Sequence, residues 1–375
     1  MGWRGLAGGG AGRVADRDAE RLAGRATTGQ AGAAGGGQAQ AAAVIRARRP
    51  AAAVRDNDSA MTLTQLNAFV LVARLGSVTA AANALGVSEP AVSQALSALR
   101  LHLGDQLVSR GPGGMTLTAG GSRLLSTASQ IVMLGAEAHA AVRAAQGAPE
   151  QLRVVATSTM AEFVISPLME AFTRRFAGSA EVSAGMAATK EMAVLVANRL
   201  ADVAIGPNVA GDPALPVVSE PIFRYRLVVV TAGQSRLRGS PRQWRWLVDP
   251  SGTDPGSDCG QLLAALRIPE DMIGVFPNQT AAWAAAADGA GVAPAVEHLV
   301  SQQVRRGELA RVELPGPPVD ACWHATLLER QHRSTAASAL RRFLSTPEAM
   351  QLMRSPAAGV RPSRFRPPVY VTIWN

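Results

Sequence analysis

The sequence predicts two parts: an α-helical N-terminal domain that carries a small β-hairpin and continues into a long helix, and a two-lobed α/β domain. Three observations predict this organisation. Residues 61–122 hold three short helical patterns followed by a hairpin pattern. Residues 119–149 form one long helical pattern with an apolar stripe. In residues 150–353 strand patterns alternate with helical ones, which is typical of a parallel sheet.

The composition limits the class of protein. The chain has 375 residues, of which 47% are hydrophobic, enough for two or three domains with their own cores. No apolar run approaches the ~18 residues of a membrane span, and no apolar segment behind a basic start indicates a secretory signal. Two cysteines, Cys259 and Cys322, fit a reducing compartment. We therefore expect a cytoplasmic protein without a membrane partner.

The net charge of +9 is located mainly at the two ends of the chain, in residues 1–60 and 354–375. Between them the basic and acidic residues nearly balance. A high isoelectric point that comes from the ends is weak support for nucleic-acid binding. Any DNA-binding function must therefore be argued from a motif.

The two ends also differ from the rest in composition. Residues 1–60 are rich in Gly, Ala and Arg and have few large apolar side chains, so they cannot bury enough surface to offset the entropy of ordering. We expect a disordered extension there, either a real flexible tail or the product of a misassigned start. Met61 opens a well-formed helical pattern and is the alternative start. Residues 354–375 form a Pro/Arg-rich tail.

The first helical pattern begins at about Thr64. Leu66, Phe69 and Val70 recur at helical spacing, and Gly76 ends the run as a C-terminal cap. These positions predict one amphipathic helix with a buried apolar face.

Two shorter helices follow. Ser77 or Thr79 can cap the second helix, which Gly86 interrupts. The Ser-Glu-Pro run at 88–90 has the composition of a new helix start, with a hydroxyl cap, an acid and an early proline. Gly104 ends this third helix.

A hairpin and the long helix complete the first part. In "LVSRGPGGMTLT" (107–118) two short β-prone arms flank a Pro-Gly-Gly tip. From Ala119 to about Gly147 apolar residues then recur at helical spacing. A helix that long with one apolar stripe usually packs on a partner helix.

The second and third helices have the spacing of a helix-turn-helix. Ala82 is a small residue where the helices would touch, Gly86 tolerates the turn, and Val92 packs the second helix back on the first. The alternative is a helical hairpin buried in a core. Against it, the start of the third helix presents a polar face able to bond to bases or phosphates. That face consists of Ser88, Glu89, Ser93, Gln94 and Ser97.

These features resemble the winged helix-turn-helix of LysR-type transcriptional regulators. The shared pattern has a Phe before an apolar pair, a Gly-Ser, a paired Ala, a Ser-x-Pro-Ala-Val-Ser helix, a Leu-Gly, an Arg before the wing and a Leu-Thr with a following Gly. The resemblance covers roughly residues 61–350. In its second part it rests on the order of elements and on pieces such as "LRVVAT", "ADVAIG" and "GAGVAP".

The resemblance implies a regulator that binds pseudo-palindromic promoter DNA, which is double-stranded, through a winged helix-turn-helix (61–122). A linker helix (119–149) would join the chains into homodimers or homotetramers. A periplasmic-binding-protein-like effector domain of two α/β lobes (150–353) would sense a small molecule and shift the arrangement of the DNA-binding domains.

The chain departs from the family pattern at four positions. Glu89 stands where Gln or a similar residue is usual, and Gln94 where Arg is frequent. Arg100 replaces an acid, and Val108 a Phe. Arg110 is retained and is the candidate for a phosphate or minor-groove contact from the wing. With so few cations one domain should bind DNA weakly, and paired domains would raise the apparent affinity. The predicted DNA-contacting residues are Thr79, Ser88, Glu89, Pro90, Ser93, Gln94, Ser97, Arg100 and Arg110.

The α/β part divides into two similar sets of strands and helices. "LRVVATST" (152–159) is the first buried strand, and "FRYRLVVVTAG" (223–233) is a strand that crosses to the second lobe. The second set continues through "CGQLLAALRI", "IGVFPN" and "RVEL". Two lobes with crossings form a clamshell, and its ligand cleft lies at the strand ends.

Polar residues follow the strands at the predicted cleft. Ser158 and Thr159 lie between a strand and a helix N-terminus, where free N–H groups and hydroxyls suit a carboxylate or another anion. The resemblance places effector contacts in this loop and in the next, where Ala188 provides one donor fewer than usual. The alternative is that these hydroxyls only cap helices. The predicted effector-binding residues are Ser158, Thr159, Thr189, Gln279 and Thr280.

Enzymatic interpretations find no support in the sequence, and we expect no enzyme activity, metal or cofactor. The histidines lack metal-ligand spacing: His102, His139, His298, His324 and His332. Cys259 follows Asp258 at a helix start, a position that can lower the pKa of a thiol. The resemblance implies that a peroxide-sensing pair would be close in sequence, and Cys322 is far from Cys259, which disfavours a redox pair. Cys322 beside Trp323 fits a core residue.

Two other functions remain as alternatives. A solute-binding clamshell that does not regulate DNA would need an export signal and no residues 61–122. A regulator whose cleft has lost its ligand would work by protein contact alone.

Overall fold

The computed structural model describes residues 61–111, 114–176, 180–209, 213, 215–235, 237–314 and 319–355. The predicted extension (1–60) and residues 356–375 of the predicted tail lie outside this part, as does the tip of the predicted hairpin at 112–113. All helices and strands below belong to the second of the two units into which the chain divides, Ser59–Asn375.

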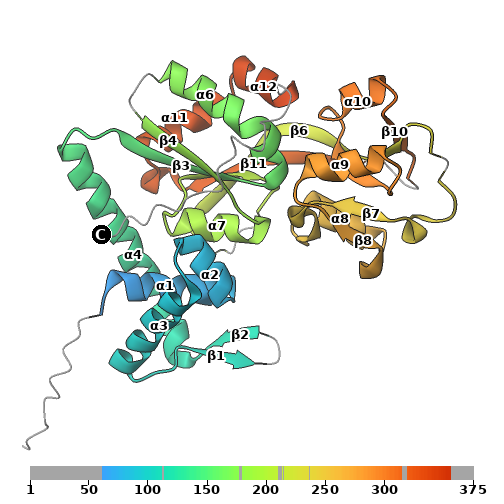
Figure 1. Cartoon of the computed structure of the whole chain (residues 1–375). Helices are drawn as coiled ribbons and strands as arrows, with labels where there is room; N and C mark the ends of the chain where they lie inside the picture. Colours follow the sequence, from blue (N-terminus) through green and yellow to red (C-terminus); the bar gives the residue numbers. More distant parts are fainter. Residues whose placement is uncertain are drawn as a thin grey trace, which may run out of the picture. The chain divides into compact units, whose positions relative to one another are not determined.

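Three helices form the N-terminal domain: α1 (Leu63–Leu75), α2 (Val78–Leu85) and α3 (Glu89–Leu103) (Figure 1). Hydroxyl side chains cap all three N-termini, and Ser77 rather than Thr79 caps α2. Each helix ends at a glycine with positive φ, as the sequence predicts. Phe69 of α1 is fully buried at the centre of this domain.

The predicted hairpin and long helix are present. The strands β1 (Val108–Gly111) and β2 (Gly114–Leu117) pair antiparallel, and α4 (Ala119–Ala145) follows. Thr118 caps α4 by accepting a hydrogen bond from the backbone N–H of Gly121. The hairpin therefore stands directly beside the start of the long helix, in the position of a wing.

The second part of the chain is built on one seven-stranded sheet and one small two-stranded sheet. The large sheet has the order β10-β6-β11-β5-β3-β4, with β9 also paired to β6, and β7 pairs with β8. The strands are β3 (Glu150–Ala156), β4 (Ala180–Met186), β5 (Val203–Gly206), β6 (Val217–Ala232), β7 (Trp246–Val248), β8 (Ile273–Val275), β9 (Ala293–Val296), β10 (Leu309–Val312) and β11 (Val319–Leu328).

Helices cover these sheets. They are α5 (Ser158–Met160), α6 (Ser166–Arg175), α7 (Thr189–Ala197), α8 (Asp258–Ala265), α9 (Gln279–Ala287), α10 (Ser301–Arg305), α11 (Thr335–Leu344) and α12 (Pro347–Arg354), with 3-10 turns at Pro241–Gln243, Pro250–Thr253, Glu270–Met272 and Arg330–His332. A π-helical segment, Ala161–Ile165, joins α5 to α6. Helical backbone thus runs without a break from Ser158 to Arg175.

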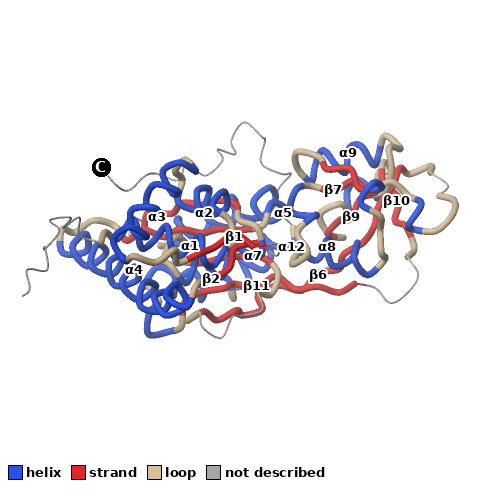
Figure 2. Tube along the Cα trace, turned by 90° about the horizontal axis from the view of Figure 1, so that it is seen from below, coloured by secondary structure: helices blue, strands red, loops and turns tan. Residues whose placement is uncertain are grey.

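The strand β6 belongs to both lobes. Its first part pairs with β11, and its last residues pair with β9 and β10. We define lobe 1 as β3–β5 with α5–α7, α11 and α12, and lobe 2 as β7–β10 with α8–α10. In Figures 1 and 2 β6 runs from one lobe to the other, as the sequence predicts for the crossing strand.

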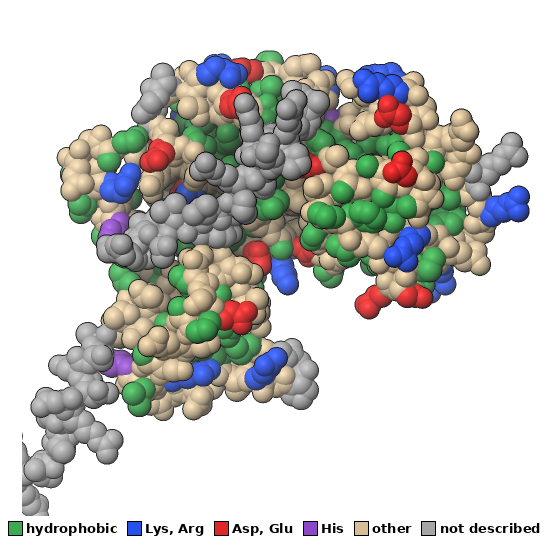
Figure 3. All heavy atoms as spheres, viewed as in Figure 1, with side chains coloured by type: hydrophobic (Ala, Val, Ile, Leu, Met, Phe, Trp, Pro, Cys, Tyr) green, Lys and Arg blue, Asp and Glu red, His purple; other side chains and the backbone are tan. Residues whose placement is uncertain are grey.

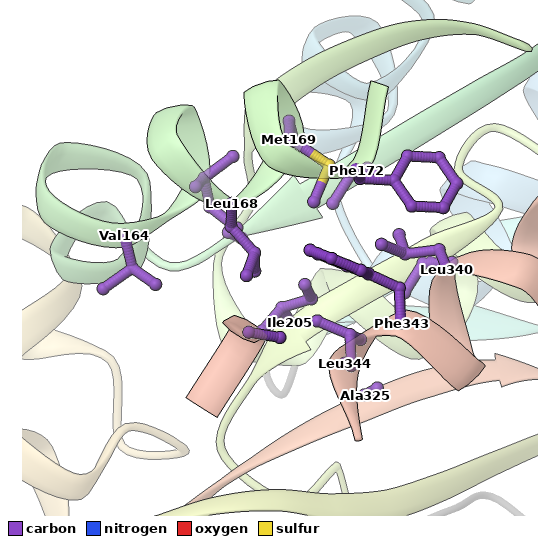
Figure 4. Close-up of a cluster of buried hydrophobic side chains, with 14 of the residues drawn as sticks. Val164, Leu168, Met169, Phe172, Ile205, Ala325, Leu340, Phe343 and Leu344 are labelled. Atoms are coloured by element: carbon purple, nitrogen blue, oxygen red, sulfur yellow. The ribbon is translucent and has the colours of Figure 1, made fainter. Parts of the chain in front are cut away.

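Lobe 1 has an apolar core between its sheet and helices. Phe172 of α6 lies against Phe343 of α11, with ring centroids 5.7 Å apart, and Ile205 of β5 lies beneath them (Figure 4). Each such buried side chain contributes about 1.5–3 kcal/mol relative to an exposed one. In lobe 2, Gly291 precedes β9 and approaches the Arg245 backbone, where an added Cβ would lie 2.3 Å from the carbonyl oxygen. Gly291 of "GAGVAP" therefore serves close packing, whereas Gly289 has open space around it and a positive φ.

Candidate functional site

The helix α3 separates an apolar face from a polar one. Val92, Leu96 and Leu99 are buried at helical spacing, and the opposite face carries most of the side chains that the sequence predicts at DNA. Thr79 of α2 is exposed as well. The exposed predicted residues of α3 and its cap are Ser88, Glu89, Pro90, Ser93, Gln94 and Ser97.

Arg100 differs from these residues because its guanidinium is bonded to backbone carbonyl oxygens of the same domain. Its Nε donates to the carbonyl oxygen of Gln106 at 2.7 Å, and one terminal nitrogen donates to that of Val108 at 2.8 Å. These bonds tie the end of α3 to the first strand of the wing. Arg100 therefore positions the wing. The sequence shows only that an arginine stands where an acid is usual, and it does not indicate this role.

The wing is fixed at its base and carries an exposed cation. Arg110 is exposed on β1, and the hydroxyls of Ser109 and Thr116 bond across the hairpin at 3.0 Å. At the base, Asp105 accepts hydrogen bonds from the Leu107 N–H at 2.6 Å and from the Thr118 hydroxyl at 2.7 Å. These bonds lower the pKa of Asp105 below its ordinary value. In Figure 3 basic side chains on the visible face lie singly or in small groups among acidic ones.

The cleft between the lobes begins at Ser158, the first residue of α5. Its hydroxyl donates to Oδ2 of Asp249, a lobe 2 residue that follows β7, and shares a 2.7 Å hydrogen bond with the Ser251 hydroxyl. Asp249 is 2% exposed. The Ser158 side chain therefore bonds to the opposite lobe and does not only cap its own helix.

Two helix N-termini at the cleft are bonded to carboxylates of the opposite lobe. The N–H of Thr189, the first residue of α7, donates to Oδ2 of Asp254 at 2.8 Å. The N–H groups of Gln279 and Thr280, which open α9, donate to Glu162 at 3.1 and 3.2 Å. Glu162 lies in the π-helical segment, a distortion frequently found at functional sites.

A small cavity of about 50 Å³ lies between the lobes. Of the five predicted effector residues, Thr159 and Gln279 line it, and Ser158 bonds to two residues that line it. Thr189 and Thr280 contact the other lobe without lining the cavity. The lining residues are Thr157, Thr159, Pro207, Tyr225, Leu227, Asp249, Ser251, Ser257, Asp258, Cys259, Gln279, Trp283, Pro294, Ala295, Val296 and Trp323.

Aromatic rings form much of the cavity wall, which the sequence analysis missed. Tyr225 and Trp323 have ring centroids 4.8 Å apart, and Phe163 stacks on Trp283 at 5.1 Å. These residues come from distant strands and helices, so no local pattern reveals them. The loop "DPSGTDPGSD" (249–258), rich in Asp, Ser and Gly directly after a buried strand, is the signal that could have identified the acidic part of the cleft.

Two ionisable groups of the cavity are strongly affected by burial. Asp258 accepts a hydrogen bond from the Tyr225 hydroxyl, and burial raises the pKa of this carboxyl above its ordinary value, as it raises the pKa of the Tyr225 phenol. Burial also raises the pKa of the Cys259 thiol. The suggestion that its helix-start position lowers that pKa is therefore wrong, because burial and then the neighbouring carboxylates of Asp249 and Asp258 all raise it. Cys322 is half-buried, and its thiol donates to the Trp323 carbonyl oxygen at 3.3 Å.

Comparison with known proteins identifies both parts of the chain. Residues 63–122 match the family model described as "Bacterial regulatory helix-turn-helix protein, lysR family", and residues 145–346 match the "LysR substrate binding domain". The chain belongs to the LysR family. It is a transcriptional regulator with a helix-turn-helix DNA-binding domain and a substrate-binding domain, and the sequence prediction of the family is confirmed.

Curated relatives agree along the whole length of the two domains. An HTH-type transcriptional regulator of Mycobacterium tuberculosis is 34% identical over 84% of this chain and 100% of its own length. The regulator CfxR of Cupriavidus necator is 28% identical over 81% of this chain and 97% of its own. A crystal structure of the LysR family regulator CbnR aligns at 22% identity with a TM-score of 0.44, covering 76% of this chain and 98% of that one.

The family assignment also bears on partners and membranes. LysR regulators bind DNA and small-molecule effectors. Among the described residues, none of the helices has the length and apolar character needed to cross a bilayer, and no cluster of three or more metal-ligating side chains occurs there.

Proposed function

We propose that this LysR-type regulator binds promoter DNA with the exposed face of α3 in a major groove and Arg110 of the wing on the backbone or in the minor groove. The observation that carries the proposal is the polar face of α3. Ser93, Gln94 and Ser97 are exposed while the residues between them are buried or half-buried, so their hydrogen-bonding groups are available to bases and phosphates. Glu89, also exposed, can accept from cytosine N4.

Arg100 takes a different part in this proposal. Its guanidinium already bonds to two carbonyl oxygens, so we assign it to holding the wing against α3 rather than to a phosphate. Ser88 caps α3 with a 3.4 Å hydrogen bond to the Ala91 N–H, and its hydroxyl retains the capacity to donate to a phosphate.

We further propose that the protein acts as a homodimer or homotetramer joined through α4. Leu134 and Val142 of α4 are 60% and 58% exposed, and apolar side chains on one long helix are the usual contact with a partner helix. The exposed surface of the N-terminal domain carries few basic side chains, so a single domain would bind DNA weakly. Two or four linked domains raise the apparent affinity without a new contact.

The cleft between the lobes is the proposed site of a small-molecule effector. It lies where strands of both lobes end, and it has an aromatic wall with a few polar groups, the usual composition of a ligand site. Ligand binding would change the bonds between the lobes and so the arrangement of the DNA-binding domains. We also propose a cytoplasmic location and no enzymatic activity, in keeping with a family of transcriptional regulators.

A gel-shift and footprint of the full chain on the DNA that flanks its own gene tests this function. We expect a protected stretch of several helical turns, the mark of a multi-domain regulator. Ser93→Ala and Arg110→Ala should each weaken binding by about 1–3 kcal/mol, the value of a base or charged phosphate contact. Arg305→Ala, which removes an exposed arginine of lobe 2, is the matched control. If no DNA were protected there or recovered in a genome-wide selection, α2 and α3 would be a helical hairpin that does not bind DNA.

A further inference from the structure

The lining of the effector cavity is acidic and aromatic. From it we infer that the effector is a small organic cation, an amine whose ammonium group binds between Asp249 and Asp258 and whose carbon frame lies on aromatic rings. This inference rests on the proposed function of the cleft as an effector site. It replaces the anion that the sequence alone favours.

The charges of the cavity have one sign. Asp249 and Asp258 line it, and no Lys or Arg side chain does so among the residues that the structure describes. Neither carboxylate has an ion pair with arginine in that part of the chain. The nearby charge that acts on Asp258 is His324, which lowers its pKa less than burial raises it. A cation entering here would find two carboxylates that form no ion pair with an arginine or lysine of the described chain.

The hydrogen bonds that these carboxylates now accept come from neutral groups. Asp249 accepts from the Ser158 hydroxyl and from the Ser251 hydroxyl at 2.8 Å, and Asp258 from the Tyr225 hydroxyl. Hydroxyl hydrogens rotate, so each oxygen can turn to another partner. An ammonium group would make shorter, charge-assisted bonds to the same carboxylates, and the pairing would offset the cost of keeping them out of water.

The aromatic wall fits the same ligand. Tyr225, Trp283 and Trp323 all line the cavity, and indole and phenol faces attract cations by their quadrupoles. Carboxylates together with tryptophan and tyrosine faces form a cage that recognises ammonium ions. The rings also offer apolar surface to the carbon part of the ligand.

An anion at Ser158 and Thr159, where the sequence predicts one, would meet carboxylates of the protein. The Ser158 hydroxyl is bonded to Asp249, and two neighbouring helix starts are bonded to other carboxylates. The N–H of Thr189 is bonded to Asp254, and the N–H groups that open α9 are bonded to Glu162. A carboxylate ligand would have to displace a carboxylate of the protein and then lie beside Asp249. Like charges at such short range oppose binding.

A further polar group at the cleft has no partner. The Thr189 side chain is 5% exposed, and its Oγ1 makes no hydrogen bond, which is costly for a buried hydroxyl. It lies beside the bond between Thr189 and Asp254 that joins the two lobes. A ligand or a change in lobe spacing that supplied this partner would gain free energy at the same place where the lobes meet.

The size of the cavity indicates how binding would proceed. A volume of about 50 Å³ holds roughly three to five water-sized groups at about 10–15 Å³ each, so it accommodates an ammonium group but not a whole aromatic amine. The carbon frame would therefore require the lobes to separate at the contact between Ser158 and Asp249. The ammonium would then take the place of the serine hydroxyl at that carboxylate.

Three compounds of one shape test the inference: benzylamine, benzyl alcohol and benzoate. Titration of the full chain, followed by tryptophan fluorescence and by thermal unfolding, should show binding of benzylamine and a rise in Tm. Asp258→Asn keeps the shape of the side chain but removes its charge. It should weaken the binding of benzylamine roughly tenfold, as should Asp249→Asn. Asp271→Asn, an exposed acid of lobe 2, is the control and should bind benzylamine as the wild type does.

Three results would overturn the inference: benzoate or benzyl alcohol binding as tightly as benzylamine, no benzylamine binding up to about 10 mM, or equal benzylamine affinity in the wild type and Asp258→Asn. Asp258 decides the test if Asp249→Asn does not fold. A gel-shift on the same preparations tests the proposed DNA-binding function separately from the binding of a cation. Intact DNA binding without amine binding would contradict only the cationic effector, whereas absence of DNA binding would contradict the proposed function.

Discussion

The polar side chains of α3 and those of the effector cleft are held in opposite ways. On α3, Ser93, Gln94 and Ser97 are exposed and point away from the apolar face of the helix. In the cleft, Ser158, Asp249 and Glu162 are bonded to groups of the opposite lobe. The first surface is complete before its partner arrives. The second, if it binds the proposed effector, must exchange bonds within the protein for bonds to that ligand.

This difference separates recognition from regulation. A surface with free donors and acceptors loses little when DNA binds, because few internal bonds break. In the proposed function, a cleft whose carboxylates close it from both sides would convert ligand binding into a change of lobe spacing, since the ligand would compete with contacts between lobes. The same chain thus combines an exposed polar surface on α3 with a cleft that its own hydrogen bonds close.

The largest expected effect comes from Phe69→Ala, which removes the fully buried ring of the N-terminal domain. It should lower the free energy of unfolding of the N-terminal domain by about 3–5 kcal/mol. DNA binding in a gel-shift should be abolished, while tryptophan emission stays native. The described tryptophans, Trp244, Trp246, Trp283 and Trp323, all belong to the effector domain. Leu101→Ala, at a side chain 74% exposed, is the control. Simultaneous loss of the native tryptophan signal would show that the two domains are not separable in this way.

A smaller effect should distinguish the two arginines of the N-terminal domain. Arg100→Ala removes two hydrogen bonds to carbonyl oxygens and should lower the free energy of unfolding by about 1.5–3 kcal/mol. Arg110→Ala, at an exposed side chain, should leave stability within about 0.5 kcal/mol and weaken DNA binding. Denaturant unfolding beside a gel-shift checks both. Equal stability losses in the two variants would contradict the roles assigned here.

The smallest effect is expected in the cleft, for Glu162→Gln. Its carboxylate accepts from two N–H groups at the start of α9, and removing the charge from a helix N-terminus costs about 0.3–1 kcal/mol. The lobes should also separate more easily, which Trp283 fluorescence reports because Phe163 stacks on that ring. Glu170→Gln, at an exposed acid of α6, is the control. If Glu162→Gln matched the control in both measurements, this carboxylate would not help to close the cleft.

The sequence predicts the N-terminal domain more completely than the cleft. Each helix there depends on nearby residues: a hydroxyl cap, an apolar stripe and a terminal glycine such as Gly86. The spacing of Ala82, Gly86 and Val92 is likewise local. Arg100 is the exception, since its partners depend on how the chain folds back after α3.

The cleft depends on contacts between residues far apart in the chain. Ser158 and Asp249 are separated by 91 residues, and Glu162 and Gln279 by 117. The sequence identifies Ser158 and Gln279 as polar residues at helix starts, but it contains no local sign that carboxylates will face them. The expectation of an anion followed from the helix start at Ser158 and Thr159 considered alone, and in the folded chain the Ser158 hydroxyl is already bonded to the carboxylate of Asp249.

The late position of β11 in the chain has a consequence for synthesis on the ribosome. Within the large sheet β5 pairs with β3 on one side and with β11 on the other, and β11 also pairs with β6. Residues 319–328 must therefore emerge before one edge of β5 is covered, although β5 itself ends at Gly206. Until then the nascent chain exposes an unpaired apolar strand edge, which invites association with other chains. Lobe 1 is thus begun first and completed after lobe 2 has been made.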